Sequence, residues 1–244
     1  MNDKVSLNKL SIVIPFYNEK KRINKSLKIL QNYILKNTYR LEIIFVNDGS
    51  TDNSEKIIKK KFQTLKKNKK VKIIFINYAK NMGKGFAIIK GIIKAKSKWI
   101  LTCDFDMSVN PNTVNHWFKR KYINSYNSAF IGSRNLINSK VKTIFYRKLY
   151  GSFFKIIIMI LFGIKLNDTQ CGFKLYDSNY IKKIIKKITS YGFVHDVEII
   201  NELNNKKIKI IELPVTWKHE PNSKLNLLYD PINMIIDLIK IKFK

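Results

Sequence analysis

Acidic residues are scarce in this chain of 244 residues. Only 17 Asp and Glu stand against 47 Lys and Arg, which gives a formal net charge of +30 at pH 7. Such an excess favours an anionic environment or partner, such as nucleic acid, anionic lipid or a phosphorylated substrate. Codon bias in an AT-rich genome would also enrich lysine, together with the Ile and Asn that are frequent here. Charge alone therefore assigns no function.

Long apolar runs are also missing. The longest, residues 156–162, is bounded by Lys155 and Lys165 and is far shorter than the roughly 20 residues that span a bilayer. The N-terminal segment "MNDKVSLNKL" contains no apolar core of the kind found in signal peptides. The sequence therefore predicts neither a transmembrane helix nor a signal peptide.

Cysteine is rare, and linker-like composition is absent. The two cysteines, Cys103 and Cys171, have no metal-ligand spacing and are typical of reduced thiols in a cytosolic protein. No Pro-, Gly- or Ser-rich segment divides the chain, and no internal repeat is found. The length and the 45% hydrophobic content predict one large folded domain, with or without an appended subdomain.

Apolar runs rich in β-branched residues alternate with amphipathic helical patterns in the first half of the chain. The predicted strands are residues 9–16, 41–46, 71–76 and 99–103, and the predicted helices are residues 19–36, a segment from about residue 53, and residues 83–95. Strands that alternate with helices predict an α/β fold, with a mostly parallel sheet flanked by helices on both faces.

The second half is less regular. Its predicted strands are residues 129–131, 172–176 and 208–215, and its predicted helices are residues 143–162, 196–204 and 227–244. The last helix is amphipathic, because apolar residues recur at helical spacing among lysines. We therefore expect a main domain over residues 1–226 and an amphipathic C-terminal helix over residues 227–244.

Two of the scarce carboxylates, Asp104 and Asp106, end an apolar strand. Alternate positions on an extended chain point the same way. Both side chains can therefore reach one hard cation, Mg²⁺ or Mn²⁺, together with substrate phosphates. An isolated pair of this kind is also typical of a turn aspartate followed by a helix cap, so the neighbouring motifs decide between the two.

Other polar motifs fall at the carboxyl ends of predicted strands, where open parallel sheets bind ligands. Asp48 precedes Gly49 in a turn that can place a carboxylate against a base or a ribose hydroxyl. The segment Gly83-Lys84-Gly85 allows close approach of a ligand at a helix start, which favours anions. It lacks the Lys-Ser/Thr ending of a P-loop, so ATP chemistry of that kind is not expected.

These motifs together resemble a known family. The segments "SIVIPFYNE", "IIFVNDGSTD", "NMGKG", "DFD", "GSR" and "DTQCGFKLY" occur in the order found in inverting family 2 glycosyltransferases of the GT-A fold. Within that family, "DTQCGFKL", "HDVEI", "NSKL" and "DLIKIKF" resemble the dolichyl-phosphate β-glucosyltransferases. The resemblance implies a GT-A catalytic domain over residues 1–226. It also implies metal-dependent transfer of a hexose, expected to be glucose from UDP-glucose, to a polyprenyl or dolichyl phosphate.

The resemblance further implies a nucleotide-sugar site at the strand ends. Its expected residues are Pro15, Tyr17, Asn18, Glu19, Asp48, Gly83, Lys84, Asp168 and Gln170, the last two shaping the sugar pocket. Asp106 would ligate the metal, and Asp104 would contact the metal or the ribose. Asn47 and His195 depart from the family pattern, which usually has Asp and an aromatic residue there; Asp48 remains to contact the nucleotide.

The acceptor implied by the resemblance carries a phosphate that is already anionic near neutral pH. Its attack on the sugar C1 therefore needs little help from a general base. The site should instead offer cations to the acceptor phosphate, and we expect Arg134, Arg147 and Lys224 to do so, with a hydroxyl contact from Ser223. Arg134 lies in a matched motif and is also assigned a catalytic role.

A lipid acceptor gives the excess charge a reason. We expect residues 153–162 and 227–244 to lie at an anionic membrane surface, since basic amphipathic elements bind anionic headgroups. The protein would then associate peripherally with the cytoplasmic face of a membrane. A core helix over residues 153–162 is the competing structure, and the same apolar surface would also suit an oligomer.

The sequence is also compatible with two other functions. A related transferase would use GDP-mannose as donor or a glycan hydroxyl as acceptor, and a carboxylate close to the sugar C1 would favour the hydroxyl acceptor. A basic nucleic-acid-binding protein would cluster lysines and aromatic residues on one face. The basic residues here are spread along the chain without a nucleic-acid-binding motif, so no nucleic acid is expected as a partner.

Overall fold

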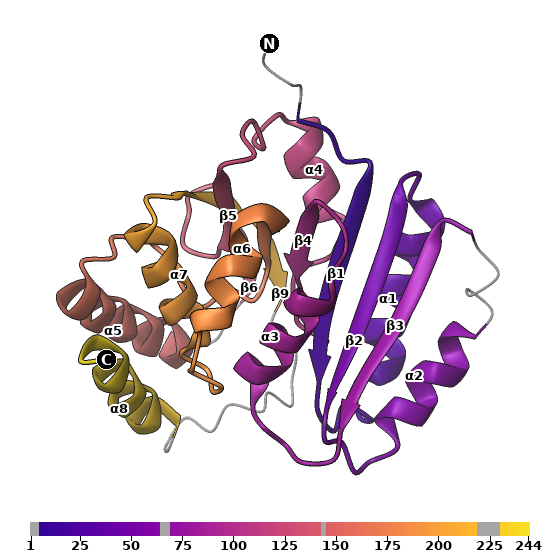
Figure 1. Cartoon of the computed structure of the whole chain (residues 1–244), viewed down its shortest axis with the longest axis horizontal. Helices are drawn as coiled ribbons and strands as arrows, with labels where there is room; N and C mark the ends of the chain where they lie inside the picture. Colours follow the sequence, from indigo (N-terminus) through magenta and orange to yellow (C-terminus); the bar gives the residue numbers. More distant parts are fainter. Residues whose placement is uncertain (1–4, 64–68, 143–144, 219–229) are drawn as a thin grey trace.

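The structure is a computed structural model that describes residues 5–63, 69–142, 145–218 and 230–244. A seven-stranded sheet runs through its centre in the order β3-β2-β1-β4-β7-β5-β8 (Figure 1). The strands are β1 (Lys9–Phe16), β2 (Arg40–Asp48), β3 (Val71–Tyr78), β4 (Trp99–Thr102), β5 (Ser128–Ser133), β7 (Lys174–Asp177) and β8 (Lys209–Pro214). Only β7 runs antiparallel to its neighbours in this sheet. The expected α/β fold with a mostly parallel sheet is confirmed.

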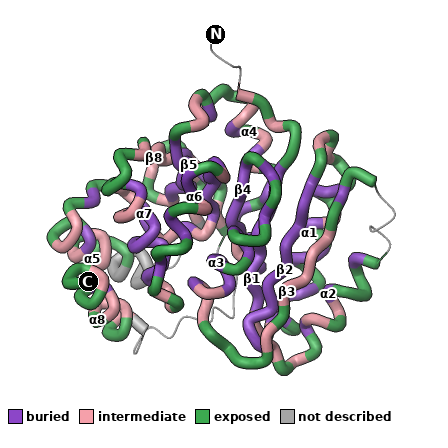
Figure 2. The backbone as a smooth tube through the Cα atoms, in the orientation of Figure 1, coloured by how far each residue is buried: buried purple, intermediate pink, exposed green. Residues whose placement is uncertain are grey.

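Helices cover both faces of the sheet, as the alternation of elements predicts. The longer ones are α1 (Ile23–Lys36), α2 (Ser54–Phe62), α3 (Lys84–Lys94), α5 (Phe145–Phe162), α7 (His195–Asn205) and α8 (Asp230–Lys242). The central strands are buried almost along their whole length, while the helices expose their outer sides (Figure 2). Such two-sided burial explains why the strands read as continuous apolar runs rather than alternating patterns.

Two apolar clusters hold the layers together. On one face, Ile12 and Phe45 of the sheet pack with Leu27 of α1 and Phe62 of α2. On the other face, neighbouring strand positions pack against α3, α7 and a short helix, α6 (Ser178–Ile184). Successive strand residues point to opposite faces, and consecutive strand residues accordingly belong to different clusters.

Among the described residues, four short α-helices and strands were not predicted from the sequence. They are α4 (Thr113–Lys119), β6 (Lys140–Lys142), α6 and β9 (Thr216–Lys218). Strands β6 and β9 form a separate two-stranded parallel sheet. Elements of three to seven residues contain too few turns or alternations to show a hydrophobic period.

The predicted helix over residues 19–36 is shorter in the structure and begins at Ile23. The backbone of Asn18 is left-handed, with φ of 48°, and the Glu19 amide donates to Ser54 Oγ at 2.7 Å. These contacts tie the segment after β1 to the start of α2. The residues between β1 and α1 therefore form a turn at the carboxyl end of the sheet.

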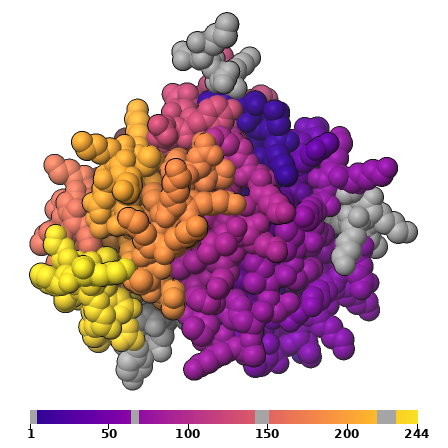
Figure 3. Space-filling model, in the orientation of Figure 1, coloured from indigo at the N-terminus to yellow at the C-terminus, as the bar shows by residue number. Residues whose placement is uncertain are grey.

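Helices α5 and α8 pack together at one end of the molecule, where both Figure 1 and Figure 3 show them side by side. Their shared core contains Ile158 and Leu238, which are almost fully buried, and it reaches α7 through Val197. The domain boundary expected at residue 226 lies outside the described residues. None of the described helices has the length and apolar character required to cross a membrane.

Candidate functional site

The carboxyl ends of β1, β2 and β4 meet at one edge of the sheet, and the direction in which successive strands are added changes between β1 and β4. Open α/β sheets bind ligands in the crevice at such a switch point. Asp48 is the last residue of β2, and the segments that follow β1 and β4 carry Glu19, Asp104 and Asp106. The topology therefore gathers most of the predicted site at one edge.

Asp104 and Asp106 each meet a cation. Lys84 Nζ lies 2.7 Å from Asp104 Oδ1, and an Arg22 guanidinium nitrogen lies 3.3 Å from Asp106 Oδ2. Arg22 also pairs with Glu19, whose Oε1 accepts from it at 2.7 Å. The other Asp106 oxygen accepts from the amide and the hydroxyl of Ser108. The carboxylate pair is thus held in place by protein cations.

The charges set the protonation states in this cluster. Burial by itself would raise the pKa of Asp104, but the adjacent Lys84 ammonium outweighs it, and the pKa lies below its usual value. Burial would likewise lower the pKa of Lys84, and the carboxylates of Asp104, Asp196 and Asp106 instead raise it. Asp104 is therefore an anion and Lys84 a cation at neutral pH.

Gly172 leaves room for the Asp104 carboxylate. A Cβ added at position 172 would lie 2.4 Å from both Asp104 oxygens, far inside van der Waals contact. On this side of Asp104, the site is therefore lined by the backbone of Gly172 and not by a side chain. This contact explains why a glycine stands within the 168–176 motif.

Asp48 organises the loop before α3. Its carboxylate accepts hydrogen bonds from the amides of Met82 at 2.8 Å and Gly83 at 3.0 Å, and from the side chain of Asn81 at 3.1 Å. Gly83 has a φ of 101°, and a Cβ there would meet the Tyr191 carbonyl oxygen at 2.4 Å. Both Asp48 oxygens already hold this loop, so a nucleotide would share them with it.

The segment after β1 lies against the turn after β2. Pro15 is buried within β1, beside Val46 of β2. Asn18 accepts from the amide of Thr51 at 2.7 Å, and its own amide donates to Ser50 Oγ at 2.9 Å. Tyr17 is half-buried. These contacts bring the predicted nucleotide residues of both strand ends together.

Arg134 follows β5 and is bound by Asp168. The guanidinium donates twice to the carboxylate, at 2.7 and 2.9 Å, and the Arg134 amide donates to it as well. Glu212 of β8 holds this loop by accepting from the amides of Asn167 and Asp168, each at 2.9 Å. Burial opposes ionisation of Asp168, yet Arg134 outweighs it and lowers the pKa of Asp168.

A small pocket opens beside Asp104 and Arg134. Gln170, Gly172 and Trp217 line it, among others, and the Trp217 ring lies 5.7 Å from the Arg134 guanidinium carbon. The Gln170 side-chain nitrogen is buried and has no hydrogen-bond partner among the residues that the structure describes. A buried polar atom without a partner is costly, so this pocket suits a ligand that carries an acceptor oxygen.

A buried ion pair supports the pocket from below. Lys174 is fully buried, and its Nζ donates to the Cys171 carbonyl at 2.6 Å and lies 2.7 Å from Asp196 Oδ1. His195 lies beside Asp196 and is also buried, which lowers the pKa of its imidazole. The pair anchors the start of α7 to the loop that carries Gly172.

Several predicted acceptor residues cannot be placed. Ser223 and Lys224 lie outside the described residues, as does the side chain of Arg147. Two residues of the site were not predicted: Arg22, which the i,i+3 spacing from Glu19 could have indicated, and Trp217, which reaches the pocket through the unpredicted β9.

The donor set at the end of β4 fits one hard divalent cation. Asp104 and Asp106 supply carboxylate oxygens, and no group of three or more His, Cys, Asp or Glu side chains that could hold a metal occurs in the described part of the chain. Mg²⁺ characteristically uses one or two carboxylates and completes its shell with substrate phosphates and water. The residues present therefore fit a metal that is shared with a diphosphate.

Comparisons with known sequences identify the family. Residues 11–185 match the model of glycosyl transferase family 2. A dolichyl-phosphate beta-glucosyltransferase of Saccharomyces cerevisiae is 34% identical over 259 residues, which cover 96% of this chain and 74% of that protein. One from Trichomonas vaginalis is 31% identical over 244 residues, with 95% and 72% covered. The Homo sapiens protein of the same name is 29% identical, with 96% and 75% covered.

Solved structures share the fold. Glucosyl-3-phosphoglycerate synthase from Mycobacterium tuberculosis, crystallised with uridine diphosphate, superposes with a TM-score of 0.68 at 13% identity, covering 97% of this chain and 81% of that chain. Staphylococcus aureus TarS in complex with UDP gives a TM-score of 0.57 at 18% identity, covering 96% and 65%. The family match spans 175 of the 244 residues, from 11 to 185, the sheet is that of the GT-A fold, and the chain belongs to glycosyl transferase family 2.

Proposed function

We propose that this enzyme transfers glucose from UDP-glucose to a polyprenyl phosphate of the dolichyl type, with inversion at the sugar C1. Support for the acceptor and the sugar comes from relatives that are named dolichyl-phosphate beta-glucosyltransferases and match about 95% of the chain. Support for a uridine nucleotide comes from fold neighbours crystallised with UDP. The strand-end cluster of Asp48, Asp104 and Asp106 is the proposed donor site.

The proposed reaction forms one bond and breaks one. A phosphate oxygen of the acceptor attacks C1 of the sugar, and the bond between C1 and the diphosphate oxygen breaks. The electron pair leaves with the diphosphate of UDP, and no proton has to be moved. Glu19, Asp48 and the loop at Gly83 would hold the nucleotide, while Gln170 and Asp168 would shape the sugar pocket.

The basicity of the carboxylates near the site is our reason for proposing a phosphate, and not a hydroxyl, as the acceptor. Asp104, Asp168 and Asp196 each have a lowered pKa despite burial, because Lys84, Arg134 and Lys174 lie against them, respectively. A lowered pKa makes a carboxylate a weak base, whereas an acceptor hydroxyl would require a base poised near the working pH. An acceptor that is already an anion needs none.

Cationic side chains near the pocket would bind the acceptor phosphate. Arg134 is the described candidate, and it keeps a side-chain exposure of 30% despite its pairing with Asp168. Guanidinium groups bind phosphate in a bidentate manner. Arg147, Ser223 and Lys224 remain proposed acceptor contacts. We assign Arg134 to the acceptor phosphate and Asp168 to holding it in position.

A divalent cation, Mg²⁺ or Mn²⁺, is part of the proposal. One fold neighbour was crystallised with Mn²⁺, UDP and phosphoglyceric acid. Asp106 and Asp104 would hold the cation, which would neutralise the charge that develops on the departing diphosphate.

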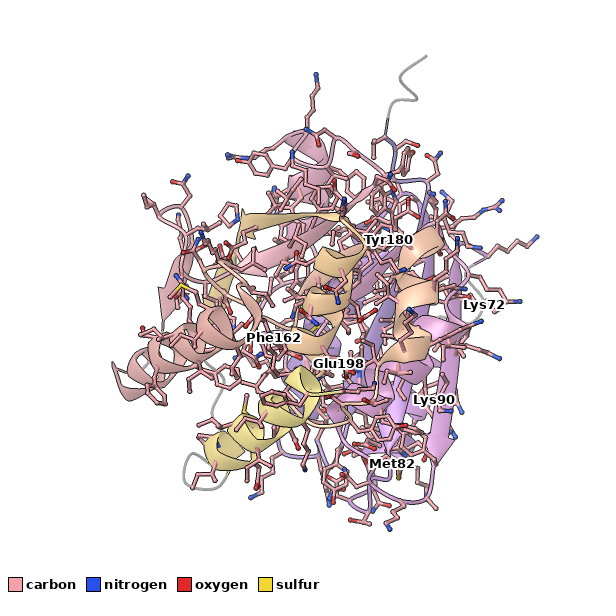
Figure 4. All side chains as sticks on the ribbon, turned by 60° about the vertical axis from the view of Figure 1, so that its left-hand side comes forward. Lys72, Met82, Lys90, Phe162, Tyr180 and Glu198 are labelled. Carbon is pink, nitrogen blue, oxygen red and sulfur yellow. The ribbon has the colours of Figure 1, made fainter. Side chains whose placement is uncertain are left out.

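The pair α5 and α8 is the proposed membrane-facing surface, on the cytoplasmic side. Apolar side chains that are more than two-fifths exposed lie on both helices; they are Phe153, Ile156, Met159 and Ile160 of α5, and Ile232, Ile236 and Ile239 of α8. Lys242 lies over the ring of Phe162, which is labelled in Figure 4. An exposed apolar face bordered by lysines suits an anionic bilayer that contains the lipid acceptor.

The donor and the acceptor can be tested in one matrix of assays. The purified enzyme is given UDP-glucose or GDP-mannose, and either a polyprenyl phosphate or the matching polyprenol, which lacks the phosphate. We expect sugar transfer only with UDP-glucose and the polyprenyl phosphate. Transfer to a hydroxyl acceptor at a similar rate would contradict the proposed acceptor, and a preference for GDP-mannose would contradict the proposed donor.

A further inference from the structure

Lys84 lies against Asp104, one of the two carboxylates proposed to hold the metal. It is the first residue of α3, and its Nζ lies 2.7 Å from Asp104 Oδ1. Gly172 keeps the other side of the same carboxylate clear. An ammonium and a divalent cation both require the oxygens of Asp104, so they compete for this carboxylate.

Asp106 differs from Asp104 in how it is held. Its Oδ1 accepts from Ser108, and its Oδ2 faces Arg22 at 3.3 Å. Arg22 keeps its pairing with Glu19 if Asp106 turns to another cation. Lys84, by contrast, has no other carboxylate in direct contact among the described residues, and nearby Asp196 is already paired with Lys174.

Charge balance indicates what Lys84 would contact next. The cluster holds three carboxylates, of Glu19, Asp104 and Asp106, and two cations, of Arg22 and Lys84. A divalent cation that binds alone would leave this partly buried cluster positive. A divalent cation that binds together with the dianionic diphosphate of a nucleotide sugar would leave its net charge unchanged, which costs far less in a medium of low dielectric.

We propose that Lys84 is an internal counter-ion that keeps divalent cations away from Asp104 until a nucleotide diphosphate arrives, and that its ammonium then pairs with the diphosphate. This inference rests on the donor site of the proposed function. The lysine side chain is a flexible, mobile point charge, and Lys84 is 28% exposed, so the exchange needs no backbone movement. Metal binding would in this way be ordered after, or coupled to, donor binding.

The test is a titration of Mn²⁺, with free Mn²⁺ measured by electron paramagnetic resonance, on the full chain with and without UDP. We expect the wild type to bind Mn²⁺ at least about tenfold more tightly with UDP than without it. Lys84→Met should bind Mn²⁺ at least about tenfold more tightly than the wild type when UDP is absent, and should bind UDP more weakly. Lys84→Arg should keep the wild-type pattern.

Lys90→Met is the matched control. Lys90, labelled in Figure 4, lies on the same helix and over the ring of Phe86, and the ion pairs described for the carboxylate cluster do not include it. Its substitution removes the same charge and should leave Mn²⁺ and UDP affinity within about twofold of the wild type. A Lys84→Met protein that melts normally and binds Mn²⁺ no better than the wild type without UDP would overturn the inference.

The result separates this inference from the proposed reaction. Absence of Mn²⁺ binding to the wild type, even with UDP, would overturn the exchange and the metal requirement together. Mn²⁺ binding with the predicted Lys84 pattern, but without glucose transfer to a polyprenyl phosphate, would support the exchange and contradict the proposed acceptor or sugar.

Discussion

Gly172 stands where a single methyl group would reach the proposed metal ligand. Because its Cβ would lie 2.4 Å from both Asp104 oxygens, Gly172→Ala must displace that carboxylate or the loop. Small displacements of catalytic groups cost large factors in rate. We expect sugar transfer by Gly172→Ala to fall by roughly 10- to 100-fold, measured as kcat/KM for UDP-glucose at a temperature well below its melting point.

Gly151 of α5 provides the control for this prediction. A Cβ there meets nothing within 4 Å, and alanine is the better helix former. Gly151→Ala should therefore keep the wild-type rate and the same or slightly higher stability. A folded Gly172→Ala enzyme with full activity would show that the position of Asp104 does not matter for the reaction.

Asp168 should make the free energy of unfolding depend on pH in the acid range. Its pKa in the folded protein is lowered by Arg134, so its stabilising contribution is complete above the unfolded pKa of about 3.9 and is lost as the pH falls through the folded pKa. Asp168→Asn should lower the free energy of unfolding by about 2–3 kcal/mol at pH 7, because it leaves Arg134 without its partner. Urea denaturation between pH 2 and pH 7 measures both effects.

The surface pair of Asp237 and Lys240 gives the comparison, since both side chains are well exposed. Asp237→Asn should change the unfolding free energy by less than about 0.5 kcal/mol at every pH. The difference in the free energy of unfolding between Asp168→Asn and the wild type should become smaller as the pH falls. A constant difference across the acid range would contradict the assignment of this pair.

Among the elements, the α5 and α8 pair carries a prediction about lipid. Ile160 of α5 is 74% exposed, and Phe243, the residue that directly follows α8, is 82% exposed, so neither supports the core of these helices. The double variant Ile160→Gln/Phe243→Gln should bind anionic vesicles roughly tenfold more weakly, because it removes apolar burial, with melting temperature unchanged. Flotation with vesicles that contain phosphatidylserine measures it.

A variant of Leu238, on helix α8, distinguishes the effect of lost core packing from the effect of lost membrane contact. It is fully buried against the cluster that includes Ile158. Leu238→Ala should lower the free energy of unfolding by about 2–3 kcal/mol. Unchanged vesicle binding by the Ile160 and Phe243 variant would contradict a membrane role for this face and favour an interface with another protein.

Element lengths explain which parts of the fold could be predicted from the sequence. The strands β1 to β4 lie in continuous apolar runs, and Asp48 and Asp104 stand at or just after the ends of two of them, so strand order alone predicted that these two carboxylates lie at one edge of the sheet. The short β9 has no readable period, and it carries Trp217 into the pocket. The pairing of Arg134 with Asp168 joins residues 34 positions apart and depends on the tertiary fold.

At the scale of the whole molecule, the charge of +30 should steer the enzyme to anionic membranes. Vesicle binding should weaken several-fold when salt is raised from about 0.05 to 0.3 M, since the Debye length shortens. Melting temperature should change little over the same range. Salt-independent binding would show that apolar contact alone holds the protein at the lipid.

The most direct measurement of the central claim is transfer of labelled glucose from UDP-glucose to a polyprenyl phosphate, with wild type and Asp106→Ala, each with and without Mg²⁺. We predict that label enters the lipid phase only with the wild type and the metal. Labelled lipid formed equally well by Asp106→Ala, or by the wild type in a chelator, would contradict the proposed site. UDP release without labelled lipid would contradict the proposed acceptor.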